Sequence, residues 1–145
     1  MIAREETMES TIMQDEMYKV MPVLDPDGSD SARLDNCLEF LVLNGIPLPM
    51  AVMITIPEPW ENDRAMSQEK KDFYQYYATM MEPWDGPASI LFTDGELMGA
   101  VLDRNGLRPS RYYITDDDYL VLSSEVGVLD VDPVSYTHLR AHETP

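Results

Sequence analysis

The feature that most constrains this chain is a change of hydrophobic pattern at Gly86. Before Gly86, apolar residues recur three and four positions apart, which is the spacing of one face of an α-helix. After Gly86, short apolar runs are separated by the turn dipeptides Asp94-Gly95 and Asn105-Gly106. Helices followed by antiparallel strands predict an α+β fold, in which the helices pack on one face of a sheet.

Two helices with recognisable ends are predicted before Gly86. The first begins at the capping residues 29–31 and ends at Asn44-Gly45, and the second is capped by Ser67 and stopped by Pro83. Their predicted apolar positions are Leu34, Cys37, Leu38, Leu41 and Val42 in the first helix, and Phe73, Tyr76, Tyr77, Met80 and Met81 in the second. Periodicity leaves residues 50–56 open between a buried strand and a short helix, and residues 1–21 show only a loose helical pattern.

The segment after Gly86 predicts a meander of four antiparallel strands. A third turn signal, Asp116-Asp-Asp118, follows the two dipeptides. The predicted strands are 88–93, 96–102, 110–115 and 119–123.

Size and charge exclude several classes of function. A chain of 145 residues holds one domain at most, and 27 acidic against 10 basic residues give a net charge of −17. Such a surface repels nucleic-acid phosphates and anionic membranes. No apolar run approaches the ~20 residues of a membrane span, and no secretion signal opens the chain. A single cysteine fits a reducing compartment, so the cytoplasm is the expected location.

The last twelve residues, 134–145, differ from the rest of the chain. They contain both histidines, His138 and His142, and they lack hydrophobic periodicity. Their amino-acid sequence resembles the translation of a sequencing adapter that was read as part of the gene. We therefore predict a domain at 1–133 and a non-native tail at 134–145. The two histidines have helical metal-ligand spacing, but no third ligand lies nearby in the sequence, and we expect no metal site.

Other candidate sites have simpler interpretations. Cys37 shares a helical face with three leucines, so it is expected to pack in the core and not to act as a nucleophile. The acidic run 25–30 departs from a calcium loop, because Gly28 stands at its fourth position and Asn36 at its twelfth, so a turn is predicted. No phosphate-binding glycine loop or dinucleotide signature occurs, and we expect no cofactor in this chain.

Asp30 has two interpretations. An aspartate at a helix start can cap the helix, which stabilises it by about 1 kcal/mol. Alternatively, its carboxylate can pair with the ammonium group of a ligand through a charge-assisted hydrogen bond. Composition alone favours the cap.

Several motifs in fixed order resemble the type 2 glutamine amidotransferases. They are Ser29-Asp30-Ser31, Gly106-Leu-Arg-Pro109 and Ser123-Ser-Glu125. The longer stretches resemble the glutamate synthases within that family: Met81-Glu-Pro-Trp-Asp-Gly-Pro87, Phe92-Thr-Asp-Gly95 and Leu102-Asp-Arg-Asn-Gly-Leu-Arg-Pro109. The resemblance covers about residues 1–133.

The resemblance implies part of an N-terminal-nucleophile hydrolase α/β/β/α sandwich. In that family an amino-terminal cysteine attacks the side-chain amide of glutamine, and its own α-amino group is the base. An asparagine–glycine pair forms the oxyanion hole, and an arginine holds the α-carboxylate. None of these four elements matches a residue here, so the chain alone is expected to be inactive. Asp30 matches the carboxylate that binds the α-amino group of glutamine, and this favours ligand binding over the cap. Arg104 and Arg108 are expected to tie loops to the sheet, with a glutamine contact as the alternative.

The implied parent enzyme takes ammonia from L-glutamine and uses it to convert 2-oxoglutarate to glutamate. FMN and an iron–sulfur cluster are expected in its other domains, and a small electron-donating subunit is a possible partner. Two alternatives stay open: the glutaminase layer of another type 2 amidotransferase, and a non-enzymatic acidic interaction module.

Overall fold

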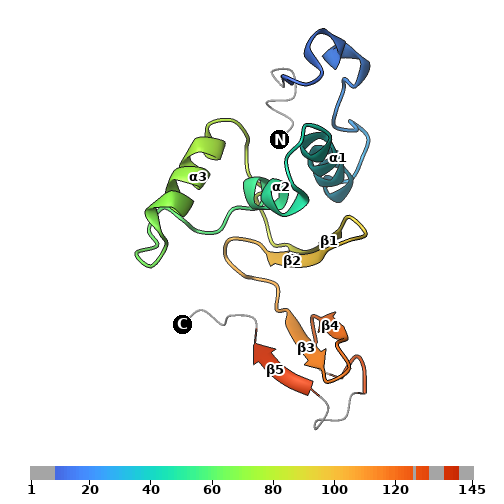
Figure 1. Ribbon diagram of the computed structural model, residues 1–145, viewed down its shortest axis with the longest axis vertical. Coiled ribbons are helices and arrows are strands. Elements are labelled where there is room, and N and C mark those ends of the chain that lie inside the picture. Colours follow the sequence, from blue (N-terminus) through green and yellow to red (C-terminus); the bar gives the residue numbers. More distant parts are fainter. Residues whose placement is uncertain (1–8, 126, 131–135, 141–145) are drawn as a thin grey trace.

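The computed structural model describes residues 9–125, 127–130 and 136–140, and it confirms the predicted α+β class. Helices come first and antiparallel strands follow (Figure 1). The helical elements are the 3-10 helix η2 (Gln14–Lys19) and the α-helices α1 (Asp30–Leu43), α2 (Leu48–Thr55) and α3 (Gln68–Ala78). The strands are β1 (Ser89–Thr93), β2 (Met98–Leu102), β3 (Arg111–Thr115), β4 (Leu120–Ser123) and β5 (Tyr136–Arg140).

Both ends of α1 are set by local hydrogen bonds, as the sequence predicts. At its start, the Ser29 hydroxyl accepts from the backbone N–H of Ala32 at 3.2 Å. At its end, Gly45 adopts φ +82°, and its N–H donates to the Val42 carbonyl at 2.9 Å. Ile46 then donates to the Leu41 carbonyl at 3.1 Å, which completes a Schellman motif.

For residues 50–56 the sequence did not decide between a strand and a short helix. They lie within the helix α2, apart from its C-cap Ile56. Pro47 is the N-cap, and Pro49 lies in the first turn. A proline is tolerated there because the first N–H groups of a helix have no intrahelical acceptor. Burial on most sides explains the missing periodicity, since Ala51, Val52, Ile54 and Thr55 are all buried.

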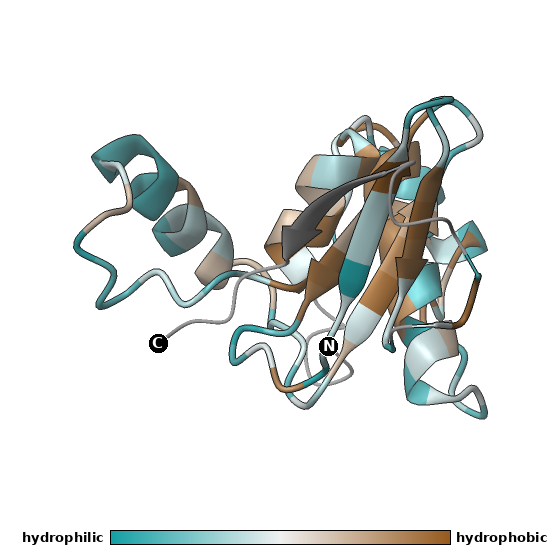
Figure 2. Cartoon of the chain, turned by 90° about the horizontal axis from the view of Figure 1, so that it is seen from below, coloured by the Kyte–Doolittle hydropathy of each residue, from teal (hydrophilic) through white to brown (hydrophobic). Residues whose placement is uncertain are grey.

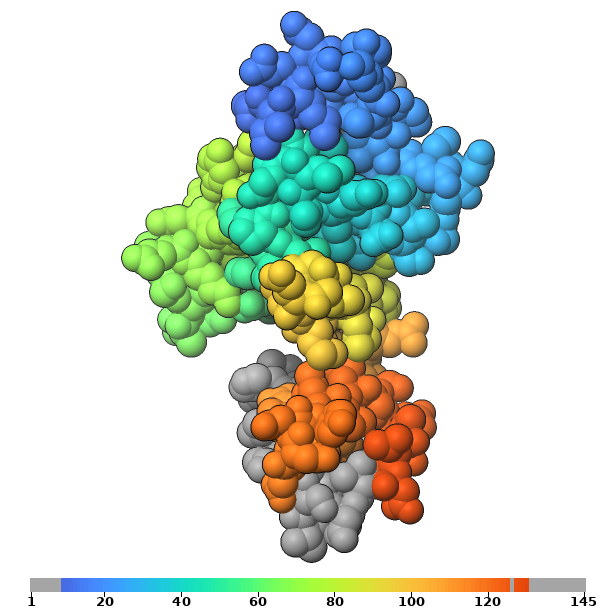
Figure 3. Space-filling model, turned by 45° about the vertical axis from the view of Figure 1, so that its right-hand side comes forward, coloured from blue at the N-terminus to red at the C-terminus, as the bar shows by residue number. Residues whose placement is uncertain are grey.

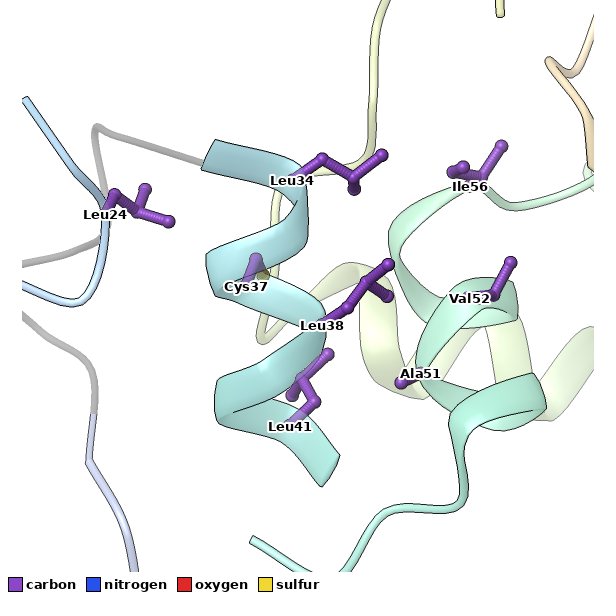
Figure 4. Packing of buried hydrophobic residues seen from close by; sticks show 8 residues of the cluster. All are labelled: Leu24, Leu34, Cys37, Leu38, Leu41, Ala51, Val52 and Ile56. Atoms are coloured by element: carbon purple, nitrogen blue, oxygen red, sulfur yellow. The ribbon is translucent and has the colours of Figure 1, made fainter. Parts of the chain in front are cut away.

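The hydrophobic core lies between α1 and α2, and strand β1 and its partner β2 close it from below (Figures 1 and 4). In Figure 4, Leu34 and Leu38 of α1 point toward α2, and Leu24 packs from the segment that precedes α1. The buried members of this cluster are Leu24, Leu34, Cys37, Leu38, Leu41, Ala51, Val52 and Ile56.

Helix α3 is capped by Ser67 as predicted, but its predicted apolar face is only partly covered: Phe73 and Tyr77 are half-buried, and Met81, beyond the end of the helix, packs against the core. The buried residue is Tyr74, which is 2% exposed, whereas Tyr76 and Met80 are each 59% exposed. The helix also ends at Ala78, well before Pro83. The physical reason is position: α3 lies at the side of the molecule and is largely hydrophilic (Figures 1 and 2). Its rings pack mainly on each other, with the Phe73 and Tyr77 centroids 4.9 Å apart.

The predicted strands form two separate sheets, not one continuous meander. Strands β1 and β2 pair antiparallel in the first sheet, and the second sheet has the order β4-β3-β5. The loop that follows Asp103 leads the chain away from β2, so β2 and β3 do not pair. In the space-filling view, β3 and β4 belong to a lobe beside the body formed by the helices and the first sheet (Figure 3).

Strand β5 overlaps the predicted non-native tail. Residues 136–140 pair antiparallel with β3, with His138 opposite Tyr113. The remaining tail residues, 134, 135 and 141–145, lie outside the described residues, and so does the second histidine, His142. The predicted boundary between residues 133 and 134 therefore stays a prediction.

The first sheet buries one face and exposes the other. Ile90 and Phe92 pack toward the core, and Phe92 lies opposite Gly99, where an added Cβ would come within 2.3 Å of the Phe92 ring. On the other face, Leu91 and Met98 are 58% and 60% exposed. An exposed apolar sheet face of this kind favours association.

We therefore expect the double substitution Leu91→Thr and Met98→Thr to raise the solubility of the 145-residue chain. Threonine keeps the strand preference, and the free energy of unfolding should change by less than about 0.5 kcal/mol, as for ordinary surface substitutions. Sedimentation after concentration measures solubility, and urea titration measures stability. The matched control, Ile90→Thr on the core face, should instead lose at least about 1 kcal/mol. Equal stability losses at the two faces would contradict this assignment.

Among the residues that the structure describes, no helix is both long and apolar enough to cross a bilayer.

Candidate substrate-binding site

Segments that are far apart in the sequence meet at one pocket of about 490 Å³. It lies where the start of α1, the approach to β1, the loop after β2 and the end of β4 come together. Its lining residues are Ser31, Trp84, Pro87, Ala88, Ser89, Ile90, Arg108, Pro109, Ser124 and Glu125. All three short motifs singled out in the sequence contribute to this lining, which makes the pocket the candidate site.

Asp30 directly precedes the pocket residue Ser31, but it does not itself line the pocket, and it does not cap α1. Ser29 supplies the capping hydroxyl, so the interpretation of Asp30 as the N-cap is wrong. Asp30 is instead the first residue of the helix, next to the pocket residue Ser31. Its side chain is 87% exposed, and the Arg33 guanidinium lies 3.9 Å from its carboxylate. The carboxylate is therefore open to a ligand.

The turn before α1 holds the start of that helix in place. Arg33 Nε donates to the Asp25 carbonyl at 3.0 Å, and the Asn36 side-chain oxygen accepts from the Asp25 N–H at 3.1 Å. Gly28 N–H closes the turn on the Asp25 carbonyl at 3.2 Å, which confirms the predicted turn. Because Arg33 is engaged with backbone carbonyls, it holds Asp30 only loosely.

Asp103 joins the two strands of the first sheet to the loop that follows them. It is 6% exposed, and its Oδ1 accepts from the Ala88 N–H at 3.0 Å. Its own N–H donates to the Ala88 carbonyl at 2.9 Å. Its Oδ2 accepts from the Asn105 N–H at 3.0 Å. Burial on its own would raise the pKa of this carboxyl, but the N–H donors, with Ala88 first, hold its pKa below the usual value.

The two arginines of the family-like stretch separate in space. Arg108 lines the candidate site, whereas Arg104 lines a smaller pocket of about 250 Å³ beside Trp60 and Tyr74. Arg104 also lies 3.6 Å from the Asp85 carboxylate, and both side chains are mostly exposed, so this ion pair contributes little stability.

Cys37 packs in the core as predicted. It is fully buried, and its thiol lies 3.5 Å from the Met81 sulfur. Burial raises the pKa of Cys37 to about 11, so the thiol stays protonated near neutral pH, and only a thiolate is a strong nucleophile. Within 9–125, 127–130 and 136–140, no three or more His, Cys, Asp or Glu side chains are grouped to hold a metal ion.

The family model described as glutamine amidotransferases class-II matches residues 1–140. The chain belongs to the class-II glutamine amidotransferases. Its helices and antiparallel strand pairs are consistent with part of the α+β N-terminal-nucleophile fold expected for this family.

Relatives of this amidotransferase chain are glutamate synthases of several kinds. The NADPH glutamate synthase large chain of Bacillus subtilis is 52% identical over 132 residues, which is 91% of this chain and 9% of the relative. The NADH glutamate synthase of Schizosaccharomyces pombe is 49% identical over 134 residues, 92% of this chain and 6% of the relative. The ferredoxin-dependent glutamate synthase of Pyropia yezoensis is 46% identical over 135 residues, 92% of this chain and 9% of the relative. The amidotransferase chain thus spans less than a tenth of these relatives.

Sequence reasoning missed Asp103, although it lies inside a quoted motif. A local signal was present: an aspartate directly after a strand and two residues before Asn-Gly is typical of a side chain that bonds its own turn. Its second bond, to Ala88, has no sequence signal because it joins residues 15 positions apart.

Proposed function

We propose that this chain is part of the glutaminase domain of a glutamate synthase. In that enzyme glutamine is hydrolysed, and the ammonia serves the reductive amination of 2-oxoglutarate to glutamate. The observation that carries the proposal is the class-II amidotransferase match over residues 1–140, together with the three relatives described above, each named a glutamate synthase. Those relatives favour this function over another type 2 amidotransferase and over a non-enzymatic acidic module.

We assign Asp30 the task of binding the α-ammonium group of L-glutamine. Its carboxylate is exposed in the first turn of α1, its sequence neighbour Ser31 lines the pocket where the motifs meet, and the cap function is taken by Ser29. A carboxylate that pairs with the ammonium distinguishes a free amino acid from a glutaminyl side chain within a protein.

The nucleophile and the redox groups belong to other parts of the parent protein in this proposal. The only cysteine of the 145 residues is the buried Cys37, so the chain by itself is expected to be inactive. One buried thiol also does not fit an iron–sulfur cluster, which is held by several thiolates. FMN and the cluster are therefore assigned to other domains, with a small electron-donating subunit as a further partner and the cytoplasm as the compartment.

We keep residues 1–133 as the amidotransferase part and 134–145 as a non-native tail. The loss of hydrophobic periodicity and the resemblance to a translated sequencing adapter support this boundary. Sequencing of the gene tests it directly: continuous native coding through codon 145 would overturn it.

The function is tested by ammonia release from two amides. The full-length protein that contains this chain should hydrolyse L-glutamine, whereas the 145-residue chain should not. N-acetylglutamine keeps the side-chain amide but lacks the ammonium group, so its kcat/KM should be at least about tenfold lower, which is the loss of roughly 1.4 kcal/mol of binding. No hydrolysis of glutamine by the full-length protein would refute the function. Equal use of both amides would refute only the assignment of Asp30.

A further inference from the structure

We propose that Asp103 is a positioning residue that sets the distance between two walls of the candidate site. One wall is the approach to β1, residues 87–90, and the other is formed by Arg108 and Pro109 in the loop after β2. The inference rests on the proposed function, because it assumes that glutamine is recognised at this site.

The first wall is tied to Asp103 by a reciprocal pair of hydrogen bonds. The Ala88 N–H donates to Asp103 Oδ1 at 3.0 Å, and the Asp103 N–H donates to the Ala88 carbonyl at 2.9 Å. Ala88 and Asp103 are both buried, so water does not compete for these bonds. Ala88 itself lines the pocket, and the distance of this wall from β2 is therefore set directly.

The second wall is tied to the same residue. Asp103 Oδ2 accepts from the Asn105 N–H at 3.0 Å, and the Asp103 carbonyl accepts from the Gly106 N–H at 2.8 Å. Gly106 adopts φ +57°, the left-handed conformation that glycine tolerates best. These bonds form a tight turn that directs the chain toward Arg108 two residues later. One carboxylate, using both oxygens, thus holds both walls.

The opposite end of the same hairpin provides a matched control. Asp94 Oδ1 accepts from the Glu96 N–H at 3.0 Å and from the Leu97 N–H at 2.9 Å, so it makes the same kind of turn contact. It does not line the candidate site. If the two carboxylates serve only to form their turns, the same substitution at Asp94 and at Asp103 should have the same effect on glutamine hydrolysis.

The test compares Asp103→Asn and Asp94→Asn in the full-length protein. An asparagine side chain has only one acceptor oxygen, so Asp103→Asn turns an N–H donor toward one of the two backbone N–H groups. We expect the KM for glutamine to rise about tenfold, because a displacement of the order of 1 Å in a positioned site has effects of that size or larger. The kcat per folded enzyme should change little, and Asp94→Asn should leave both constants unchanged.

Each result of these measurements either supports or overturns the positioning role of Asp103. A lower rate per total protein at unchanged KM means fewer folded molecules, and it would overturn the positioning role. An equal rise of KM in both variants would overturn it as well. If Asp103→Asn does not fold, Asp103→Glu, which keeps both oxygens but shifts them by one methylene, is measured with the same expectation. If neither folds, Asp103 serves stability alone. A wild-type protein that releases no ammonia refutes the proposed function, and an active one with unchanged KM in the Asp103 variants refutes only this inference.

Discussion

Replacing Asp30 with alanine in the full-length protein is expected to raise the KM for glutamine at least tenfold. Truncation of one partner of a desolvated charge pair costs roughly 2–5 kcal/mol, and every 1.4 kcal/mol corresponds to about a factor of ten. Among the residues that the structure describes, the ion pair of the Asp30 carboxylate is a long one, 3.9 Å to an Arg33 side chain that bonds backbone carbonyls. Its removal therefore deprives the ligand ammonium of a counter-charge and breaks only this weak contact within the chain. Steady-state ammonia release measures the effect.

Two controls separate ligand binding from helix stability. Asp35→Ala removes another exposed carboxylate from α1 and should leave KM unchanged. Asp30→Asn keeps the size of the side chain but not its charge, and it should resemble the alanine variant. If Asp30→Ala lowers only thermal stability, through the lost favourable charge at the helix start, then ligand binding is the wrong assignment.

Replacing Asp103 with alanine is expected to destabilise the first sheet by about 1–3 kcal/mol. The buried Ala88 N–H would lose its acceptor, and an unsatisfied buried donor costs roughly 1–3 kcal/mol. The Asn105 N–H would lose its acceptor as well, but Asn105 is exposed, so water can replace the carboxylate there. Hydrogen exchange of the peptide that covers 86–106 in the full-length protein measures this local opening. Faster exchange should be confined to this peptide.

The same contact predicts a dependence on pH. The pKa of Asp103 is lower in the folded protein than in the unfolded chain, so the folded state holds the charged form more strongly. Its stabilisation is fully present above the unfolded pKa, near 4, and it is lost as pH falls through the lower folded pKa. Local stability of wild-type protein should therefore fall at acidic pH, and the Asp103→Ala variant should lack this component.

Asp94→Ala serves as the control for both measurements. The backbone N–H groups of Leu97 and Glu96 also lower the pKa of Asp94, but its turn is open to water. Water can replace its carboxylate, so hydrogen exchange near Ala88 should not change. Equal protection of Ala88 in wild type and Asp103→Ala would show that the carboxylate is not its essential acceptor.

Features that depend on neighbouring residues were predictable from the sequence. The start of α1 within residues 29–31, its end at Asn44-Gly45, the cap at Ser67 and the turn at 116–118 were all predicted correctly. Each depends on a hydrogen bond or a backbone preference within a few residues, so its physical cause can be read from residues that are neighbours in the sequence. The burial of Cys37 was likewise predictable from helical spacing.

Features that depend on distant partners were not predictable. Tyr74, and not Tyr76, is the buried residue of α3, because only packing decides which side of a peripheral helix is covered. Periodicity likewise did not show whether β2 and β3 pair.

The sequence by itself determined the α+β class, most element boundaries and the motifs that mark the family. Only the tertiary structure decided that Ser31, Arg108 and Glu125 line one pocket, and that Ser29 rather than Asp30 caps the helix beside it. It also decided that one buried carboxylate, Asp103, holds two walls of that pocket. The reason is that local hydrogen bonds form between near neighbours, whereas a pocket is made by chain segments whose approach is governed by the packing of the whole core.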